Sequence, residues 1–496
     1  MAKYLIAHDL GTSGNKATLF DIEKGPVKHI TVSYDVHFFN RNYAEQDAND
    51  WWRAVCVSTK QIMEGISPGQ IAGISFSAQM QCCLPVDKAG NPLRPAIIWA
   101  DGRAVEETKT LIHALGEDEI YRTTGHRPSP NYTLEKLMWI RENEPDIYNQ
   151  TYKVLQAKDF VIHKLTGNFV TDYSDASGTN MLNLDTLSWS EDILKASGIS
   201  EALMPELHRS VDVVGYVTTS AASETGLSEG TPVVCGGGDG PCSAIGAGCV
   251  SDDAFFSSFG TSAWIGGTTK EKVIDPDKIC FYFAHVIPGR YMPCGTMQAA
   301  GSSYSYIKSV LAPDMSYEEL NHLMETSSPG SKGLIFLPYL LGERSPRWNE
   351  RTSGAFLGIK PEHTKADYVR AVMEGVGYNL DIILHAFRKH TNISQLVLTG
   401  GGAAGDVVCR ILADIFDAKL IAPSDAQGAT SVAAALIAGV GIGAYPGFEA
   451  YQNFIQYDKA YTPNASNTAA YGKYKKIFDD SYHALYHVFD SLYDLR

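Results

Sequence analysis

The chain has 496 residues and a formal net charge of −15, with 44% apolar and 20% charged residues. This length predicts two to four domains with large buried cores, and the apolar and charged shares are those of a globular protein. The excess of negative charge argues against a nucleic-acid-binding protein, whose phosphate contacts need a basic face, and against binding to an anionic membrane.

Targeting and redox signals favour the cytoplasm. His8 and Asp9 interrupt the first apolar run, so no secretory signal pattern is present. The longest stretch of low polarity, residues 432–445, is too short to span a bilayer and predicts a buried helix. The nine cysteines form no CxxC pair, so we expect reduced thiols and no zinc site.

Two strands joined by a polar turn are predicted at the start of the chain. Residues 5–10 and 17–20 are mostly apolar, and the turn between them is rich in Gly, Thr and Ser. Glycines allow positive φ, so backbone N–H groups can converge on an anion. The candidate phosphate contacts are Gly11, Thr12, Ser13 and Lys16, and Asp9 is a candidate ligand of a divalent metal. An ordinary hairpin is the alternative.

The next predicted elements are a helix and three strands. Residues 47–65 predict a helix capped by Asn49 or Asp50. Residues 71–78 predict a buried strand, and residues 82–87 and 92–99 predict two more. Polar residues just past strand ends are where α/β proteins place ligand contacts. The candidates for a polyol pocket are Gln79, Met80, Gln81, Trp99, Asp101 and Arg103.

The middle of the chain is predicted to be helical and then glycine-rich. Helical periodicity runs from residue 105 to 165, and residues 172–179 predict a polar loop. A strand near residue 231 then leads through three glycines to Asp239, followed by Gly240 and a helix of small residues. Asp239 is a candidate catalytic carboxylate, although a helix-capping role is equally compatible with its position.

A second Gly-Thr-Ser turn, Gly260-Thr261-Ser262, lies between two β-prone runs within residues 254–267. Gly11 and Gly260 are separated by about half the chain. A repeat of this period predicts two similar domains, each offering a hairpin tip to a shared cleft. Beyond it, strands are predicted within residues 280–293 and a helix within residues 365–389, and residues 447–496 predict closing helices.

Residues 400–405 have the pattern GxGxxG between a strand and a helix, which taken alone predicts a dinucleotide oxidoreductase. The next strand, residues 419–422, is followed by Pro423 and Ser424, with no acidic residue to hold a ribose diol. The same turn can press its backbone against an adenosine. Together with two phosphate turns and an aspartate, it favours phosphoryl transfer, in which the protein mainly positions groups and neutralises charge.

These stretches resemble the FGGY family of carbohydrate kinases, within the actin/hexokinase/Hsp70 ATPase superfamily. The resemblance rests on residues 9–16, residues 259–262, residues 398–403, Gly354 to Ile359 with Asp367, Tyr368, Ala371 and Glu374, and Thr133, Lys136, Leu137, Trp139, Ile140, Glu142 and Asn143. Asn131 departs from the family pattern, which has an aromatic or small residue there. The resemblance implies an α/β fold with two ribonuclease H-like (actin-like ATPase) domains flanking a deep cleft. The expected domains are residues 1–248, residues 249–445 and a C-terminal helical segment, 446–496.

The resemblance also implies roles for individual residues, with ATP and Mg2+ as cofactors. Asp239 would be the general base, and Asp9 and Asp239 would bind Mg2+. The phosphates would contact Gly11, Thr12, Ser13, Lys16, Gly260 and Thr261, and the adenosine would contact Gly401, Gly402, Ala403 and Asp406.

The implied substrate is a ketopentose such as D-xylulose, because Gln79-Met80-Gln81 resembles the Gln-Met-His of xylulokinases more than the Gln-Arg-Glu of glycerol kinases. Gln81 replaces their histidine, and Gly240 replaces their asparagine. Ribulose, erythrulose, glycerol and gluconate are therefore alternative substrates, and a non-catalytic nucleotide-binding regulator is an alternative function. The expected partners are small molecules, and a homodimer is one option for the assembly.

Overall fold

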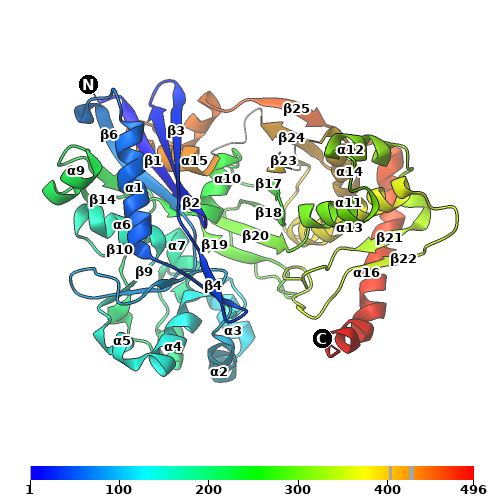
Figure 1. The fold of residues 1–496 in the computed structure, drawn as a ribbon, viewed down its shortest axis with the longest axis horizontal. Helices are drawn as coiled ribbons and strands as arrows, with labels where there is room; N and C mark the ends of the chain where they lie inside the picture. Colours follow the sequence, from blue (N-terminus) through cyan, green and yellow to red (C-terminus); the bar gives the residue numbers. More distant parts are fainter. Residues whose placement is uncertain (1, 402–404, 424–428, 496) are drawn as a thin grey trace.

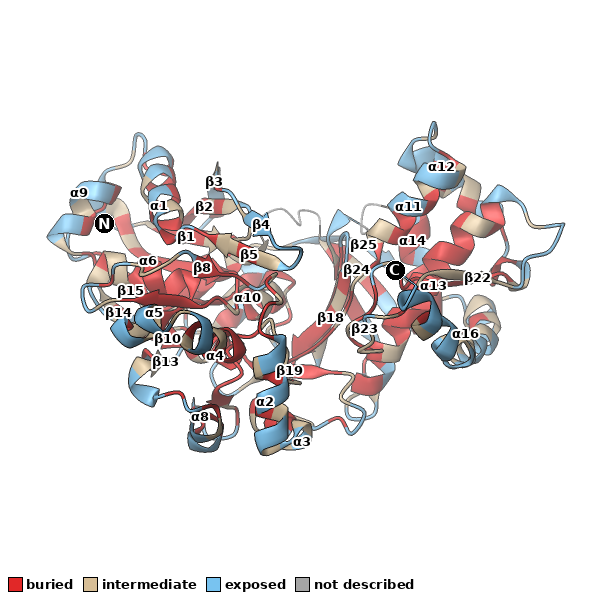
Figure 2. Ribbon diagram, turned by 60° about the horizontal axis from the view of Figure 1, so that its bottom comes forward, coloured by how far each residue is buried: buried red, intermediate tan, exposed pale blue. Residues whose placement is uncertain are grey.

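The computed structural model describes residues 2–401, 405–423 and 429–495, which form two lobes built around one large sheet each (Figure 1). The strands of both sheets are largely buried, and exposed residues lie on outer helices such as α9 (Thr219–Thr225) and α12 (Tyr317–Glu325) (Figure 2).

The first sheet has the strand order β14-β15-β6-β1-β2-β3, with β16 also paired to β6. The hairpin β1–β2 and its neighbour β3 are antiparallel, whereas β6 is parallel to both β1 and β15. The strands are β1 (Tyr4–Leu10), β2 (Gly14–Asp21), β3 (Gly25–Ser33), β6 (Ile71–Ala78), β14 (Val213–Tyr216), β15 (Pro232–Val234) and β16 (Gly237–Gly238).

The second sheet has the order β19-β20-β18-β17-β23-β24-β25. Its strands are β17 (Ala254–Phe259), β18 (Ala263–Thr268), β19 (Phe281–Ala284), β20 (Tyr291–Met297), β23 (Gln395–Thr399), β24 (Lys419–Pro423) and β25 (Tyr457–Tyr461). An antiparallel hairpin, β17–β18, again leads the sheet, and β17 is parallel to β23. The series β20-β18-β17-β23-β24 repeats the series β3-β2-β1-β6-β15, so the predicted repeat of a half-chain unit is confirmed.

Both faces of the first sheet are covered. Side chains alternate along β1, so Ile6 and Leu10 join one apolar cluster and Leu5 and Ala7 join another. The first cluster contains residues of α1 (Ala48–Ile62) and α6 (Ala157–Thr166). The second contains residues of α10 (Asp239–Gly246) and α15 (Ala429–Gly441). A helix from late in the chain therefore completes the core of the first lobe.

Further helices and short strands fill the first lobe. The helices are α2 (Val105–Leu115), α3 (Glu117–Thr124), α4 (Thr133–Asn143), α5 (Pro145–Gln150), α7 (Tyr173–Ser177) and α8 (Glu191–Ser197), with 3-10 turns at Pro68–Gln70 and Glu201–Leu203. The short strands are β4 (His37–Phe39), β5 (Tyr43–Gln46), β7 (Leu84–Val86), β8 (Ala96–Ile97), β9 (Lys153–Leu155), β10 (Val170–Asp172), β11 (Leu182–Asn183), β12 (Ser188–Trp189) and β13 (Glu206–His208).

The second lobe adds α11 (Gly301–Leu311), α13 (Lys365–Arg388), α14 (Asp406–Phe416) and α16 (Ala465–Tyr493), with strands β21 (Ile335–Leu337) and β22 (Ala355–Leu357) and 3-10 turns at Ser331–Gly333 and Phe448–Asn453. The lobes meet along β19. Tyr282 N donates to Gly125 O at 3.1 Å, and Ala284 N donates to the Ser177 hydroxyl oxygen at 3.1 Å.

Three local predictions differ from the structure. Helix α1 is capped by Asp47, whose Oδ1 accepts from Asn49 N at 2.9 Å, rather than by Asn49 or Asp50. The polar loop predicted at residues 172–179 contains a short helix, α7, because Asp172 accepts from the amides of the first turn. The segment expected to be helical, 446–496, contains α16 but also strand β25, which extends the second sheet.

None of the nine cysteines forms a disulfide, and all but Cys56 are buried, as predicted. Over the described ranges, no helix is long and apolar enough to cross a membrane.

Candidate active site

The carbonyl groups at the tip of the first hairpin accept hydrogen bonds from two neighbouring residues, Tyr34 and Gln46. Tyr34 donates from its hydroxyl to Gly11 O at 2.6 Å and from its backbone N to Ser13 O at 3.2 Å. Gln46 Nε2 donates to Thr12 O at 2.7 Å. Neither the Thr12 nor the Ser13 amide donates to another described residue, so both remain available to an anion, as a phosphate-binding turn requires.

The tip of the second hairpin is held by the start of α11. Gly301 N donates to Gly260 O at 2.9 Å, and the amides of Ala300 and Ser302 both donate to Thr261 O at 3.0 Å. A Cβ atom on Gly301 would lie only 2.4 Å from Gly260 O, so this approach requires glycine. In both hairpins, therefore, hydrogen bonds to the carbonyl groups of the turn fix its orientation.

A cavity of about 1010 Å³ opens beside the second hairpin. Its wall contains Gly260, Thr261, Gly401 and Asp406, which are four of the residues predicted to contact ATP, while Gly402 and Ala403 lie outside the described residues. The cavity also takes side chains from α11, α12 and α14, including Tyr304, Tyr317, Asn321 and Arg410. A cavity of this size, with apolar walls and a few polar groups, suits a nucleotide.

Asp406, at the start of α14, is fixed by β25. Its Oδ1 accepts from Lys459 Nζ at 2.7 Å and from the Tyr461 hydroxyl at 2.8 Å. The hydrogen bond from Lys459 is the largest cause that lowers the pKa of Asp406. Its carboxylate therefore joins the wall of the cavity to the last strand of the sheet.

Asp9, near the end of β1, contacts a residue from the far end of the chain. Thr430 Oγ1, at the start of α15, donates to Asp9 Oδ2 at 2.5 Å. Burial raises the pKa of Asp9, while Thr430 and the charge of Lys16, its partner across the hairpin, oppose this rise. No sequence pattern marked Thr430 as a residue of the site.

Asp239 is the first residue of α10, directly after the glycine segment, as predicted. Burial, and to a lesser extent the negative charge of Asp9, raise its pKa to about 7. The two carboxylates therefore lie within electrostatic range of each other. Mg2+ is commonly bound by one or two carboxylates together with substrate phosphates, so Asp9 and Asp239 fit such an ion. No group of three or more His, Cys, Asp or Glu suited to a metal occurs over the described ranges.

The glycine segment before Asp239 is anchored by buried polar residues that the sequence analysis missed. Gly238 N donates to the Ser174 hydroxyl oxygen at 3.0 Å, and that hydroxyl donates to Asp172 Oδ2 at 2.5 Å. Lys158 Nζ lies 3.0 Å from Asp172 Oδ1, and both side chains are fully buried. A chain of contacts thus runs from a buried ion pair to the backbone that presents Asp239.

The predicted sugar residues do not all present their side chains in the same way. Gln79 is buried, and its Nε2 donates to Gln46 Oε1 at 2.7 Å, while its Oε1 has no partner among the described residues. Gln46 thus contacts both Gln79 and the first hairpin. No local sequence signal marked Gln46, because its contacts lie far away in the chain.

Met80 fills a slot lined by glycines. A Cβ atom on Gly238 would lie 2.5 Å from Met80 Sδ, and a Cβ atom on Gly178 would lie 2.9 Å from Met80 Cε. Gly240 lies in ordinary contact distance, because its Cβ would be 3.8 Å from Met80 Sδ. The structure therefore brings Met80 together with the glycines that flank Asp239.

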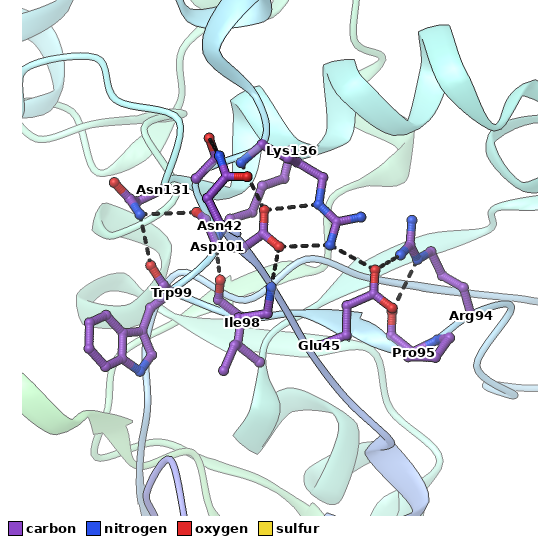
Figure 3. Close-up of polar contacts among 12 residues, drawn as sticks. Asn42, Glu45, Arg94, Pro95, Ile98, Trp99, Asp101, Asn131 and Lys136 are labelled. Carbon is purple, nitrogen blue, oxygen red and sulfur yellow. Dashed lines mark hydrogen bonds and ion pairs between the residues drawn. The ribbon is translucent and has the colours of Figure 1, made fainter. Parts of the chain in front are cut away.

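Trp99 has a side chain that is 40% exposed, and its Nε1 donates to Thr12 Oγ1 at 2.9 Å. This contact joins a predicted sugar residue to a predicted phosphate residue. Asp101, in contrast, is fully buried. Its carboxylate accepts from Ala44 N at 2.6 Å and from Arg103 Nε at 2.9 Å (Figure 3). Its side chain is thus engaged by the backbone of β5 and by Arg103.

Comparison with known proteins gives two family matches. Residues 4–246 match the FGGY family of carbohydrate kinases, N-terminal domain, and residues 255–442 match the C-terminal domain of the same family. A xylulose kinase of Staphylococcus epidermidis is 34% identical, with 96% of this chain and 95% of that protein covered.

Two solved structures from Lactobacillus acidophilus have the same fold over 99% of this chain and 100% of theirs. The ligand-bound xylulose kinase has a TM-score of 0.94 at 29% identity, and the gluconate kinase has a TM-score of 0.95 at 28% identity. The predicted fold, two actin-like ATPase domains, is confirmed by these similarities and by the repeated sheet order.

Proposed function

The chain belongs to the FGGY family of carbohydrate kinases, and on this basis we propose that it transfers the γ-phosphoryl group of ATP to a hydroxyl of a ketopentose such as D-xylulose. The observation that carries the proposal is the place of Asp239, at the start of α10 and within electrostatic range of Asp9, near the end of β1 in the first hairpin.

Asp239 would act as the general base. A carboxylate near the attacking hydroxyl accepts its proton as the bond to phosphorus forms, and a pKa close to the working pH favours this role. Burial, which raises the pKa of Asp239 to about 7, supports the assignment. The ion pair behind Ser174 would keep the carboxylate in place, because it fixes the backbone of Gly238.

The hairpin amides would hold the phosphates. Thr12 and Ser13 offer amides without partners among the described residues, and Lys16 adds a cation on the neighbouring strand. Asp9 and Asp239 would hold Mg2+, which when bound neutralises charge on the transferred phosphoryl group. The adenosine would occupy the cavity beside Gly401 and Asp406. We expect the reaction to take place in the cytoplasm, where ATP is available and free cysteines persist.

A neutral sugar is supported by the charges near the predicted sugar segments. Arg103 is engaged by Asp101 and Glu45, and Lys136 donates to two backbone carbonyls. Neither cation is left for a substrate carboxylate. The half-exposed indole of Trp99 offers an apolar face, which suits the C–H face of a sugar.

The second candidate substrate is a sugar acid such as gluconate, and Arg344 favours it. Arg344 forms no ion pair over the described ranges. The charges of Arg344 and Asp239 both act on the pKa of the buried Cys294 thiol, Arg344 lowering it and Asp239 raising it. A guanidinium that has no ion-pair partner among the described residues and acts on the same thiol as the proposed base could pair with a substrate carboxylate.

The proposal is tested by measuring ADP release with xylulose, ribulose, erythrulose, glycerol and gluconate. We expect the highest kcat/KM with xylulose, and Arg344→Met should leave it nearly unchanged. Gluconate as the best substrate, with a large loss in Arg344→Met, would support the second candidate. If the protein binds ATP but phosphorylates none of these compounds, the proposed kinase activity on them is overturned. That result would favour a nucleotide-binding regulator.

The base assignment needs its own variant. Asp239→Asn should lower kcat by about 10²–10⁴-fold, the range for removal of a general base, with nearly unchanged ATP binding. Calorimetric titration with ATP provides the control for folding. Turnover at the wild-type rate in Asp239→Asn would contradict the assignment.

A further inference from the structure

Three side chains, one just before α4 and two in its first turn, bind the backbone of both predicted sugar segments. They are Asn131, Thr133 and Lys136, which we call the α4 clamp. Their acceptors are five carbonyl groups, those of Gln81, Cys82, Ile98, Trp99 and Asp101. Side chains that reach this many backbone oxygens of two separate loops fix the distance between the loops.

Lys136 makes the central contacts of the clamp. Its side chain is fully buried, and Nζ donates to Gln81 O at 2.9 Å and to Ile98 O at 2.7 Å. It forms no ion pair over the described ranges, and burial lowers its pKa to about 8. A buried ammonium without a paired carboxylate is costly, so stability alone gives little reason to place one here.

Gln81 has a backbone conformation that needs support. Its φ is +64°, in the left-handed region that non-glycine residues seldom adopt. The bond from Lys136 to Gln81 O and the bond from Thr133 Oγ1 to Cys82 O, both 2.9 Å long, hold the two peptide groups that follow Gln81. The clamp thus determines where the side chains of Met80 and Gln81 point.

Asn131 holds the other segment. Its Nδ2 donates to Trp99 O at 3.1 Å and to Asp101 O at 3.0 Å (Figure 3). Its Oδ1 accepts from the Ser129 hydroxyl at 2.9 Å, which orients the amide. An aromatic or small residue at this position could not make both bonds. Asn131 therefore restrains the backbone of Trp99 in a way that the usual family residue would not.

We propose that the α4 clamp is the positioning element of the sugar site, which sets sugar affinity by holding Gln81 and Trp99 at a fixed separation. The proposal rests on the proposed function, because it takes these residues to line the sugar site. None of the three clamp side chains needs to touch the sugar. Their effect is transmitted through the carbonyls that they bind.

The test compares Lys136→Met with Lys153→Met. Lys153 is a matched control, because its Nζ also donates to two carbonyls, Ala202 O at 2.9 Å and Met204 O at 2.7 Å, away from the sugar segments. Each variant loses one ammonium and two carbonyl contacts. We expect Lys136→Met to raise the sugar KM by about tenfold or more, with the KM for ATP within about twofold of wild type. Lys153→Met should leave both values unchanged, and Lys136→Arg, which keeps the charge and the donors, should recover part of the loss.

An equal change of the sugar KM in both Met variants, or a rise of the ATP KM that matches the rise for sugar, would overturn the proposal. If Lys136→Met fails to fold, Asn131→Ala provides the milder test, with a rise of about three- to tenfold in the sugar KM expected. No rise in that variant would contradict the proposal.

A second measurement separates this proposal from the proposed function. Acrylamide quenching of Trp99 fluorescence, obtained as the difference between each variant and its Trp99→Phe counterpart, needs neither sugar nor turnover. Loss of the clamp should increase this quenching in Asn131→Ala and not in Lys153→Met. If wild type phosphorylates no sugar but the quenching differs as expected, the proposed function fails and the positioning role stands. Unchanged quenching would overturn the positioning role itself.

Discussion

Trp99 Nε1 donates a 2.9 Å hydrogen bond to Thr12 Oγ1, so a side chain of the proposed sugar site directly contacts the proposed phosphate hairpin. Occupancy of one region can therefore affect the geometry of the other. We predict that Trp99→Phe and Thr12→Val each lower kcat/KM for the sugar, but that the double variant loses less than the sum.

The reason is that each single substitution already breaks the shared bond. A double-mutant cycle on kcat/KM should give a coupling of about 1 kcal/mol, the usual net contribution of one hydrogen bond. The cycle removes the separate effect of Thr12 on phosphate. Additive effects, within about 0.3 kcal/mol, would show that the contact has no functional consequence.

Gly238→Ala should displace Met80. The new Cβ would lie 2.5 Å from Met80 Sδ, and Gly238 has φ of −64°, so the backbone itself tolerates alanine. Overpacking of this kind costs about 1–3 kcal/mol of unfolding free energy, and we expect the sugar KM to rise. In the double variant with Met80→Ala the clash is absent, so urea unfolding should show less destabilisation than the sum of the single variants. Simple additivity would contradict this explanation.

Thr430→Val should weaken the binding of Mg2+. Without the 2.5 Å bond from Thr430, the pKa of Asp9 rises, so less of its carboxylate is ionised and able to bind a cation. We expect a higher Mg2+ concentration for half-maximal activity and a nearly normal rate at saturation. Ser431→Ala is the control, since that hydroxyl accepts from Thr18 Oγ1 at 2.8 Å instead of binding Asp9. The same Mg2+ requirement in Thr430→Val and wild type would disprove the role.

His8 should make the protein less stable in acid. Its buried ring accepts from Asn15 Nδ2 at 3.0 Å, and burial lowers its pKa to about 4 from 6.5. Between these two values the unfolded chain binds a proton that the folded chain does not, so stability falls as the pH drops below 6.5. Relative to wild type, His8→Gln should lose about 2 kcal/mol less unfolding free energy between pH 7 and pH 5. Urea unfolding at both pH values measures this.

Glu343 should change the pH dependence of stability in the opposite direction to His8. Burial raises its pKa to about 8 from 4.5, so the folded chain binds a proton that the unfolded chain has released, and stability rises as the pH falls between these values. Glu343→Gln should therefore gain less stability than wild type, by about 2 kcal/mol, when the pH is lowered from 7 to 5. A change of the same sign in both variants would show that other groups dominate.

The features that the sequence predicted best are local or repeated. Both hairpins follow from glycines between apolar runs, and the strand β6 from a continuous apolar stretch. The residues that the sequence missed act across large separations. Gln46, Ser174 and Thr430 are ordinary polar residues whose importance depends on partners elsewhere in the chain. No periodicity or spacing marks such a residue until the partner has been placed.

Asp101 and α15 are two further cases in which the contacts of a residue or helix could not be predicted from the sequence. A polar residue after a strand predicts a ligand contact, but whether its carboxylate faces a ligand or Arg103 depends on the conformation of three residues. The apolar sequence of α15 predicts burial, and the structure confirms that. Which sheet would bury it could not be inferred, because both sheets have an apolar face.

The position of α15 prevents a simple division of the chain into two independent halves. A fragment that ended near residue 248 would lack α15 and leave Leu5 and Ala7 exposed on one face of its sheet. The complementary fragment would carry α15 as an apolar helix with nothing to cover it. The two sheets repeat one strand order, yet the place of α15 makes the apolar core of the first half depend on a helix that the second half of the chain supplies.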